Sequence, residues 1–163
     1  MINHLKPLWF CLTLACSPFV TADWQNKIAP KITGTDLQQQ TKISLKDYAG
    51  KTILLDFWAS WCAPCRQSLP ELNRLQKELI EHDFVVIAVN LDENIEDARR
   101  FLRQFPVQYP ILIRVASSQI EPYQIEGLPV SYLIDNKGKV VTRFLGFKKH
   151  HLKQIKKYVL QNP

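Results

Sequence analysis

The stretch ILLDFWASWCAPC, residues 53–65, decides how the rest of the chain can fold. Its first half is apolar, and we expect a buried β-strand over residues 51–58. Two features interrupt the apolar pattern: Asp56 lies in the middle of the strand, and the pair Cys62 and Cys65 follows it directly. A carboxylate is costly to bury. Its place just ahead of two cysteines therefore calls for a chemical explanation.

The composition is that of an ordinary globular protein. The chain has 163 residues, of which 46% are hydrophobic, and a net charge of +6. This length predicts one main domain, which we place at residues 23–163. The basic residues are dispersed except near the C-terminus, whereas a nucleic-acid-binding protein has a dense basic face with interleaved aromatic residues. We therefore expect no nucleic-acid partner.

Residues 1–22 have the pattern of an export signal. Lys6 supplies positive charge, a short apolar run follows, and Val20 and Ala22 are the small residues that signal peptidase requires. The run is too short to span a bilayer, which takes about 20 residues. We expect cleavage after Ala22 and a soluble protein in the periplasm.

An alternative reading of the same segment ends before Cys16. The sequence LTLAC, residues 12–16, resembles a bacterial lipoprotein cleavage site, in which Cys16 would carry a lipid and tether the protein to a membrane. Leu14 is atypical for that site. Both readings predict an exported protein whose working thiols are Cys62 and Cys65.

Alternating strand and helix patterns along the chain predict an α/β fold. The run FVVIAV, residues 84–89, is apolar on both faces and is typical of a strand parallel to its neighbours. Asn94 can cap a helix. We expect a β-hairpin within residues 29–50, further strands at 109–115, 130–134 and 140–145, and helices that begin at 62, 95, 117 and near 149, the last with its lysines facing water.

A Cys-x-x-Cys pair that opens a helix after a buried strand is suited to redox chemistry. Helix N–H groups stabilise a thiolate, and such placements lower a cysteine pKa. We expect Cys62, at an exposed helix tip, to be the nucleophile, and Cys65, on the buried helix stripe, to be the resolving thiol. A structural zinc site needs four ligands, and the sequence offers no second Cys-x-x-Cys; an inert disulfide would close almost no loop.

The segment DFWASWCAPCRQSLPEL, residues 56–72, resembles the active site of thioredoxin-like proteins, in particular the exported TlpA/ResA/CcmG group of thiol–disulfide oxidoreductases. The likeness extends to KISLKDYAGK, VVIAVNLDE and GLPVSYLIDNKGKVV. It implies a thioredoxin-like fold: a central mixed sheet flanked by helices, with an N-terminal β-hairpin extension and a helix-containing insertion. It also implies a redox-active disulfide between Cys62 and Cys65, with no cofactor and no metal.

The resemblance implies further site residues. Pro129 matches the family's cis-proline, and the backbone of Leu128 would pair with an extended substrate. Trp61, Ala63 and Pro64 would complete the docking surface, while Trp58 mainly packs. We expect protein disulfides as substrates, a membrane thiol–disulfide electron donor of the DsbD or CcdA kind, and a monomer.

The sequence departs from the family at positions that bear on the substrate. ResA-like members carry a glutamate where this chain has Ser68, and CcmG-like members an acidic residue where it has Val130. Both departures weaken cytochrome c biogenesis as the role. They leave Asp56, which thioredoxin shares, as the proposed general base for Cys65.

Two other functions compete with disulfide reduction. A peroxiredoxin shares the fold but needs a hydroxyl residue where this chain has Ala59. A Sco-like copper-handling protein would use both thiolates and a distal histidine, for which His150 and His151 are candidates, but that family spaces its cysteines one residue further apart. The direction of electron flow is not determined by the sequence; the resemblance favours a reductase.

Overall fold

A seven-stranded mixed sheet runs through residues 24–163, the part of the chain that the computed structural model describes, in the order β2-β1-β5-β4-β3-β6-β7. The predicted export signal lies outside the described residues. The α/β fold with a central mixed sheet is confirmed.

Strand β3 (Thr52–Trp58) lies inside the sheet and carries the start of the quoted stretch. It pairs in parallel with β4 (Phe84–Asn90) and antiparallel with β6 (Val130–Ile134). All residues of β3 and β4 are buried. The predicted parallel arrangement of β4 is confirmed, because β5 (Ile111–Ile113) also pairs with it in parallel.

The outer strands are antiparallel. The predicted N-terminal hairpin forms from β1 (Thr33–Asp36) and β2 (Lys42–Ser44), and β1 joins the sheet through β5. At the other edge, β7 (Val140–Leu145) pairs with β6 after a turn in which Asp135 Oδ1 accepts hydrogen bonds from the backbone N–H groups of Lys137 and Lys139.

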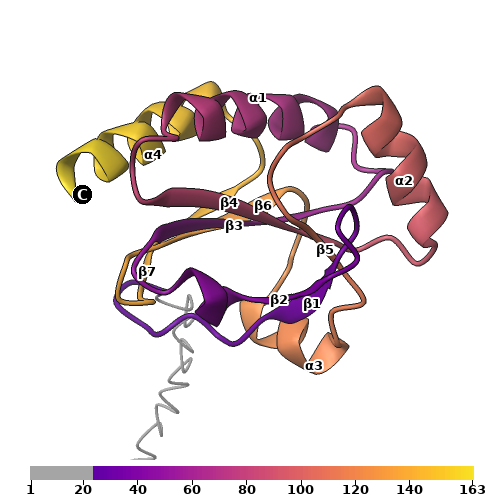
Figure 1. Ribbon diagram of the computed structural model, residues 1–163, viewed down its shortest axis with the longest axis horizontal. Helices are drawn as coiled ribbons and strands as arrows, with labels where there is room; N and C mark the ends of the chain where they lie inside the picture. Colours follow the sequence, from indigo (N-terminus) through magenta and orange to yellow (C-terminus); the bar gives the residue numbers. More distant parts are fainter. Residues whose placement is uncertain (1–23) are drawn as a thin grey trace, which may run out of the picture.

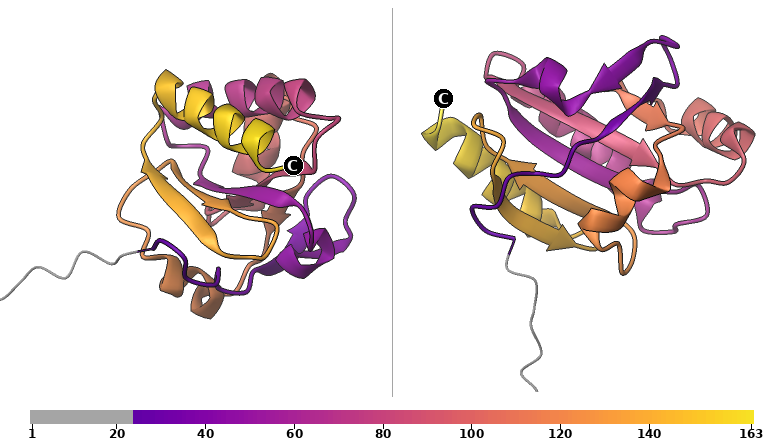
Figure 2. Two further views of the ribbon diagram at one scale, coloured as in Figure 1. Left: turned by 90° about the vertical axis from the view of Figure 1, so that its left-hand side faces the viewer. Right: turned by 90° about the horizontal axis from the view of Figure 1, so that it is seen from below.

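Helices cover both faces of the sheet (Figures 1 and 2). One face carries α1 (Cys65–Glu78), α2 (Ile95–Gln104) and α4 (Lys149–Gln161) over one apolar cluster. The other carries α3 (Ser117–Ile120) and the 3-10 turns η1 (Leu45–Tyr48) and η2 (Glu121–Tyr123) over a second cluster. In residues 24–163 none of the helices has the length and apolar character needed to cross a membrane.

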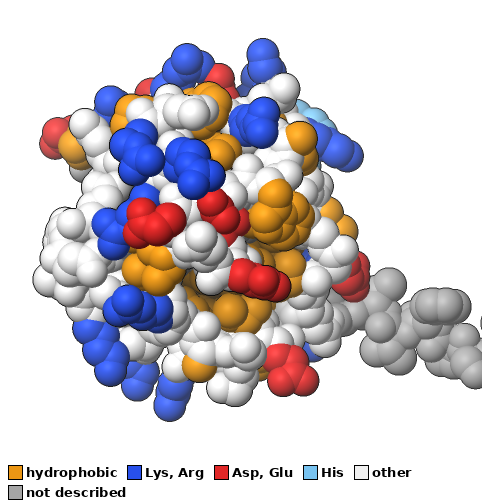
Figure 3. All heavy atoms as spheres, turned by 90° about the vertical axis from the view of Figure 1, so that its right-hand side faces the viewer, with side chains coloured by type: hydrophobic (Ala, Val, Ile, Leu, Met, Phe, Trp, Pro, Cys, Tyr) orange, Lys and Arg blue, Asp and Glu red, His pale blue; other side chains and the backbone are white. Residues whose placement is uncertain are grey.

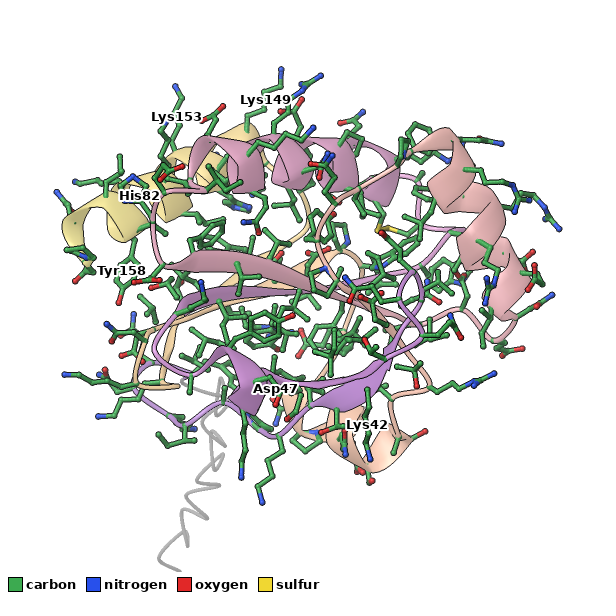
Figure 4. All side chains as sticks on the ribbon, viewed as in Figure 1. Lys42, Asp47, His82, Lys149, Lys153 and Tyr158 are labelled. Carbon is green, nitrogen blue, oxygen red and sulfur yellow. A yellow bond between two sulfur atoms is a disulfide. The ribbon has the colours of Figure 1, made fainter. Side chains whose placement is uncertain are left out.

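Two predicted helix features are confirmed. Helix α2 is the helix of the insertion after β4, and the Asn94 side chain caps it by accepting a hydrogen bond from the Glu96 N–H at 3.0 Å. The lysines of α4 are exposed, and Lys149 and Lys153 point away from the sheet (Figure 4). Residues 117–125 form a shorter helix than expected, because α3 passes into η2 at Glu121.

Candidate active site

The cysteine pair lies where β3 ends and α1 begins. After Trp58 the chain turns, and the N–H of Cys62 donates to the carbonyl of Ala59 at 3.2 Å. Cys62 and Cys65 are joined by a disulfide, with their Cα atoms 5.3 Å apart. The disulfide, yellow in Figure 4, lies at the end of α1 that is nearer to α2. Both sulfurs thus lie just beyond the carboxyl end of the inner strand β3.

The helix begins later than the sequence indicates. Helix α1 starts at Cys65, not at Cys62, and Pro64 is its N-cap residue. The reason is a tight turn over residues 62–65, closed by a hydrogen bond from the Cys65 N–H to the Cys62 carbonyl at 3.1 Å. Cys62 therefore precedes the positive end of the helix, whose first turn carries no acidic residue to offset it.

Cys62 is also less exposed than expected. Its exposed fraction is 4%, because it packs into the same apolar cluster as Trp58 and Ala59, so it is not at an exposed tip. Cys65 has an exposed fraction of 0%. Of the two cysteines only Cys62 has any exposed surface, and its role as the nucleophile stays a prediction.

A hydrogen-bond network that the sequence reading missed supports the turn. Asp92, just after β4, accepts hydrogen bonds from the Ser60 N–H at 3.1 Å and from the Ser60 hydroxyl at 2.9 Å. The Asn90 side-chain amide donates to the same carboxylate at 2.7 Å. A usable signal existed, because the carboxyl ends of adjacent parallel strands lie side by side, which brings residues after β4 to those after β3.

The aromatic and apolar residues next to the cysteines in the sequence differ in exposure. Trp61 has an exposed fraction of 70%, whereas Trp58 is fully buried and packs against Phe101 at a ring distance of 5.1 Å. Ala63 and Pro64 are exposed as well. Hydrophobic side chains reach the surface in patches between charged ones on the side of the molecule where α2 lies (Figure 3).

The second part of the predicted docking surface is the loop before β6. The Leu128–Pro129 peptide bond is cis, as the resemblance implies. Leu128 is half-buried, and Pro129 is buried with its carbonyl accepting a hydrogen bond from the Gly146 N–H at 2.8 Å. The pairing of the Leu128 backbone with a substrate stays a prediction.

Asp56 lies on the face of the sheet that α1 covers. Side chains alternate along a strand, and the neighbours that share its face, Leu54 and Trp58, belong to the apolar cluster that contains Cys65. Ser131 is the register partner of Asp56 on β6. The Ser131 hydroxyl donates to Asp56 Oδ1 at 2.6 Å, while Oδ2 has no hydrogen-bond partner among the described residues.

Burial governs the charge of Asp56. Loss of solvent raises its pKa from 3.8 to about 7, although the hydrogen bond from Ser131 lowers it in part. Burial also raises the pKa of the Tyr109 phenol, and the nearby Asp56 carboxylate raises it further. A carboxyl group with a pKa near 7 can accept and release a proton at neutral pH.

Comparison with known proteins finds relatives of this chain among thiol–disulfide oxidoreductases. A family model described as the AhpC/TSA family matches residues 26–143. The chain belongs to this family. A thiol-disulfide oxidoreductase ResA of Bacillus cereus is 38% identical over 120 residues, which cover 74% of this chain and 69% of that protein.

Solved structures place this AhpC/TSA family member among thioredoxin-like folds. A Chlorobium tepidum protein assigned as the thiol:disulfide interchange protein DsbE has a TM-score of 0.78 and 34% identity, covering 85% of this chain and 96% of that one. The thioredoxin domain of a Bacteroides vulgatus thiol-disulfide oxidoreductase has a TM-score of 0.76 and 28% identity, covering 83% and 97%. The protein is a thiol–disulfide oxidoreductase with the thioredoxin-like fold.

Ser68 leaves this family member with one buried carboxyl on the face of the sheet that α1 covers. Ser68 is buried, and its hydroxyl donates to the Cys65 carbonyl at 3.3 Å, so its side chain is engaged with the helix. The other buried carboxylate in residues 24–163, Asp36, lies on β1 and accepts a hydrogen bond from the Gln38 N–H. Asp56 is thus the carboxyl that the fold places on the face of Cys65.

Asp56 makes the stability of the fold depend on pH. Because its pKa is higher in the folded state, the stability that the bound proton supplies is lost as pH rises from 3.8 to about 7. The shift corresponds to on the order of 4 kcal/mol. In urea unfolding of the oxidised protein, Asp56→Asn should be more stable than the wild type at pH 8 by up to this amount, with the gain shrinking toward pH 4.

The control for this measurement is Asp36→Asn, which changes the second buried aspartate. A pH-dependent gain of the same size in Asp36→Asn would show that the effect does not come from Asp56. Parallel stability curves for the wild type and Asp56→Asn would show that Asp56 does not titrate within this range, and would contradict the raised pKa.

Proposed function

We propose that the protein is an exported reductase of protein disulfides. The observation that supports this most is the combination of the Cys62–Cys65 disulfide with a buried carboxyl, Asp56, on the same face of the sheet. An oxidoreductase needs an attacking thiolate, a second thiol that resolves the mixed disulfide, and a site for the second thiol's proton.

The proposed reaction has two exchanges. The Cys62 thiolate attacks one sulfur of a substrate disulfide, a new S–S bond forms, and the other substrate sulfur leaves as a thiolate. Asp56 then takes the proton of the Cys65 thiol, and Cys65 attacks the sulfur of Cys62. The mixed disulfide breaks, the substrate leaves with both sulfurs reduced, and the protein holds the Cys62–Cys65 disulfide.

Each remaining site residue has a role in this proposal. Trp61, Ala63 and Pro64 present apolar surface beside the disulfide, and Leu128, next to Pro129, offers its backbone to an extended substrate chain. Burial of Cys65 keeps solvent and stray oxidants from the resolving thiol. The same burial disfavours its ionisation, which is why a base on the same face of the sheet is useful.

The first test is the equilibrium redox potential of the domain against glutathione or dithiothreitol. We expect a reducing protein, with a potential nearer to that of thioredoxin, about −270 mV, than to that of the oxidant DsbA, about −120 mV. Cys62→Ser is the control and should exchange no disulfide. A potential near the oxidising value would reverse the proposed direction of electron flow.

The second test separates the two exchanges. Asp56→Asn should slow resolution of the mixed disulfide by about a hundredfold, the lower end of what a positioned base contributes, and change the first attack much less. Rapid-quench detection of the mixed disulfide measures both rates, and Cys65→Ala supplies the standard because it cannot resolve. Equal rates in Asp56→Asn and the wild type would leave Asp56 with a structural role alone.

Export rests on the signal-like pattern of residues 1–22 and on the likeness to the exported group. In bacterial cells the mature protein should begin at Asp23, or at a lipid-bearing Cys16, as mass spectrometry of the exported fraction would show. Alkylation in those cells should find Cys62 and Cys65 as thiols, since we infer that a membrane donor keeps them reduced. An intact Met1 in the cytoplasm would contradict export, and oxidised cysteines would contradict the donor.

The two competing functions gain no support. Ala59 stands where a peroxiredoxin requires a hydroxyl residue, and it is buried. Across residues 24–163 no group of three or more His, Cys, Asp or Glu side chains lies together so as to hold a metal ion. Neither observation favours the copper-handling or the peroxidase alternative over disulfide reduction.

A further inference from the structure

The position of Asp56 poses a problem of proton release. Its exposed fraction is 0%, so a proton that it accepts from Cys65 cannot pass directly to water. The carboxyl must return to its charged form before the next turnover. A route through the protein is therefore needed, and this part of the argument rests on the proposed role of Asp56.

Ser131 offers the first step of such a route. Its hydroxyl lies 2.6 Å from Asp56 Oδ1, and it is the hydrogen-bond partner of that carboxyl among the described residues. Ser131 is half-buried, in contrast to Asp56. A hydroxyl both donates and accepts, so it can receive a proton on one side and give one up on the other.

Ser131 also lines a small cavity. Its volume is about 20 Å³, enough for one water molecule. Its lining includes Ser131 and Pro129, Ser68 of α1, Phe147, and His151 of α4. The adjoining Gly146 is exposed and His151 is partly exposed, so the cavity lies close to the surface.

We propose that Ser131 relays the proton of Asp56 to water in this cavity, and that the cavity is the path by which the buried carboxyl exchanges protons with solvent. Ser131 thereby acts as a relay residue of the resolving step. The relevant partner of the cavity is water, or a hydronium ion, and not a substrate.

The relay is balanced in atoms and charge. The neutral Asp56 carboxyl donates its proton to Ser131 Oγ while the Ser131 hydroxyl proton passes to a water molecule in the cavity. Asp56 becomes a carboxylate, Ser131 is again neutral, and one proton has entered the solvent. For this step the hydroxyl first turns from Oδ1 toward the cavity water. The proton that Oγ then receives from Asp56 lies between Oγ and Oδ1, which restores the hydrogen bond seen in the structure.

The surroundings of Asp56 contain few other groups that could carry this proton. Helix α1 contributes Cys65, which is in a disulfide, and the segment before β5 contributes Tyr109, whose phenol donates to the Leu69 carbonyl at 3.2 Å. The partner of Asp56 on β4 is Ala88. From α4, His151 lines the cavity, and burial together with nearby His150 and Lys148 lowers its pKa.

The test follows Asp56 directly by time-resolved infrared spectroscopy on the oxidised protein. After a jump from about pH 5 to about pH 9, across the Asp56 pKa of about 7, the carboxyl C=O band should disappear. Ser131→Ala and Ser131→Val should slow that disappearance by about a hundredfold, the lower end of what a positioned proton-transfer group contributes. Asp56→Asn lacks the band and so identifies it.

Two control variants separate the hydroxyl from packing. Ser131→Thr keeps the hydroxyl with nearly the shape of valine, and it should restore the wild-type rate. Ser68→Ala changes the same cavity without touching Asp56, and it should leave the rate unchanged. Together these results would support the relay.

Other outcomes would overturn it. Wild-type rates in Ser131→Ala and Ser131→Val would show that the proton leaves by another path. Equal slowing in Ser68→Ala and Ser131→Thr would assign the effect to the shape of the cavity. Because the measurement uses neither a substrate nor a reductant, either result would leave the proposed reductase function to be judged by its own tests.

Discussion

The burial of strand β3 is the constraint on which the rest of the structure depends. It has a strand on each side and an apolar cluster on each face, so all of its residues are buried. A charge in such a place has a high free energy. The fold places the Asp56 carboxyl there. Among residues 24–163 its side chain has one hydrogen bond, from Ser131 to Oδ1, and Oδ2 has none, while burial raises its pKa to about 7.

The same strand also determines the geometry of the cysteines. Its carboxyl end leads into the turn that brings Cys62 and Cys65 to disulfide distance, with their Cα atoms 5.3 Å apart. Asp92 supports that turn from the neighbouring parallel strand through the backbone and side chain of Ser60. The turn that carries the cysteines is thus supported by β3, which leads into it, and by Asp92 after β4, while the neighbouring Trp61 is exposed.

Sequence patterns predicted most of the fold because its elements carry local signals. The apolar runs of β3 and β4 and the cap at Asn94 each follow from residues that are neighbours along the chain. The predicted start of α1 at Cys62 was wrong, because a Cys-Ala-Pro-Cys turn and a first helical turn have the same pattern of residues. Asp92 and Ser131 were missed for a different reason: they act on residues 32 and 75 positions away, and only the strand register brings them there.

The chain enters the domain at Trp24, far from the disulfide. Trp24 packs against Tyr123 and Tyr132 on the face of the sheet opposite to the disulfide. Asn26 and Ala29 donate hydrogen bonds to Val140 and Gly138, beside the turn between β6 and β7, where β3 begins rather than where it ends. The polypeptide thus enters the domain at the end of the sheet away from Cys62 and Cys65. An attachment at the amino-terminal side would therefore join the domain at the end of the sheet opposite to the disulfide, and would leave the disulfide end uncovered.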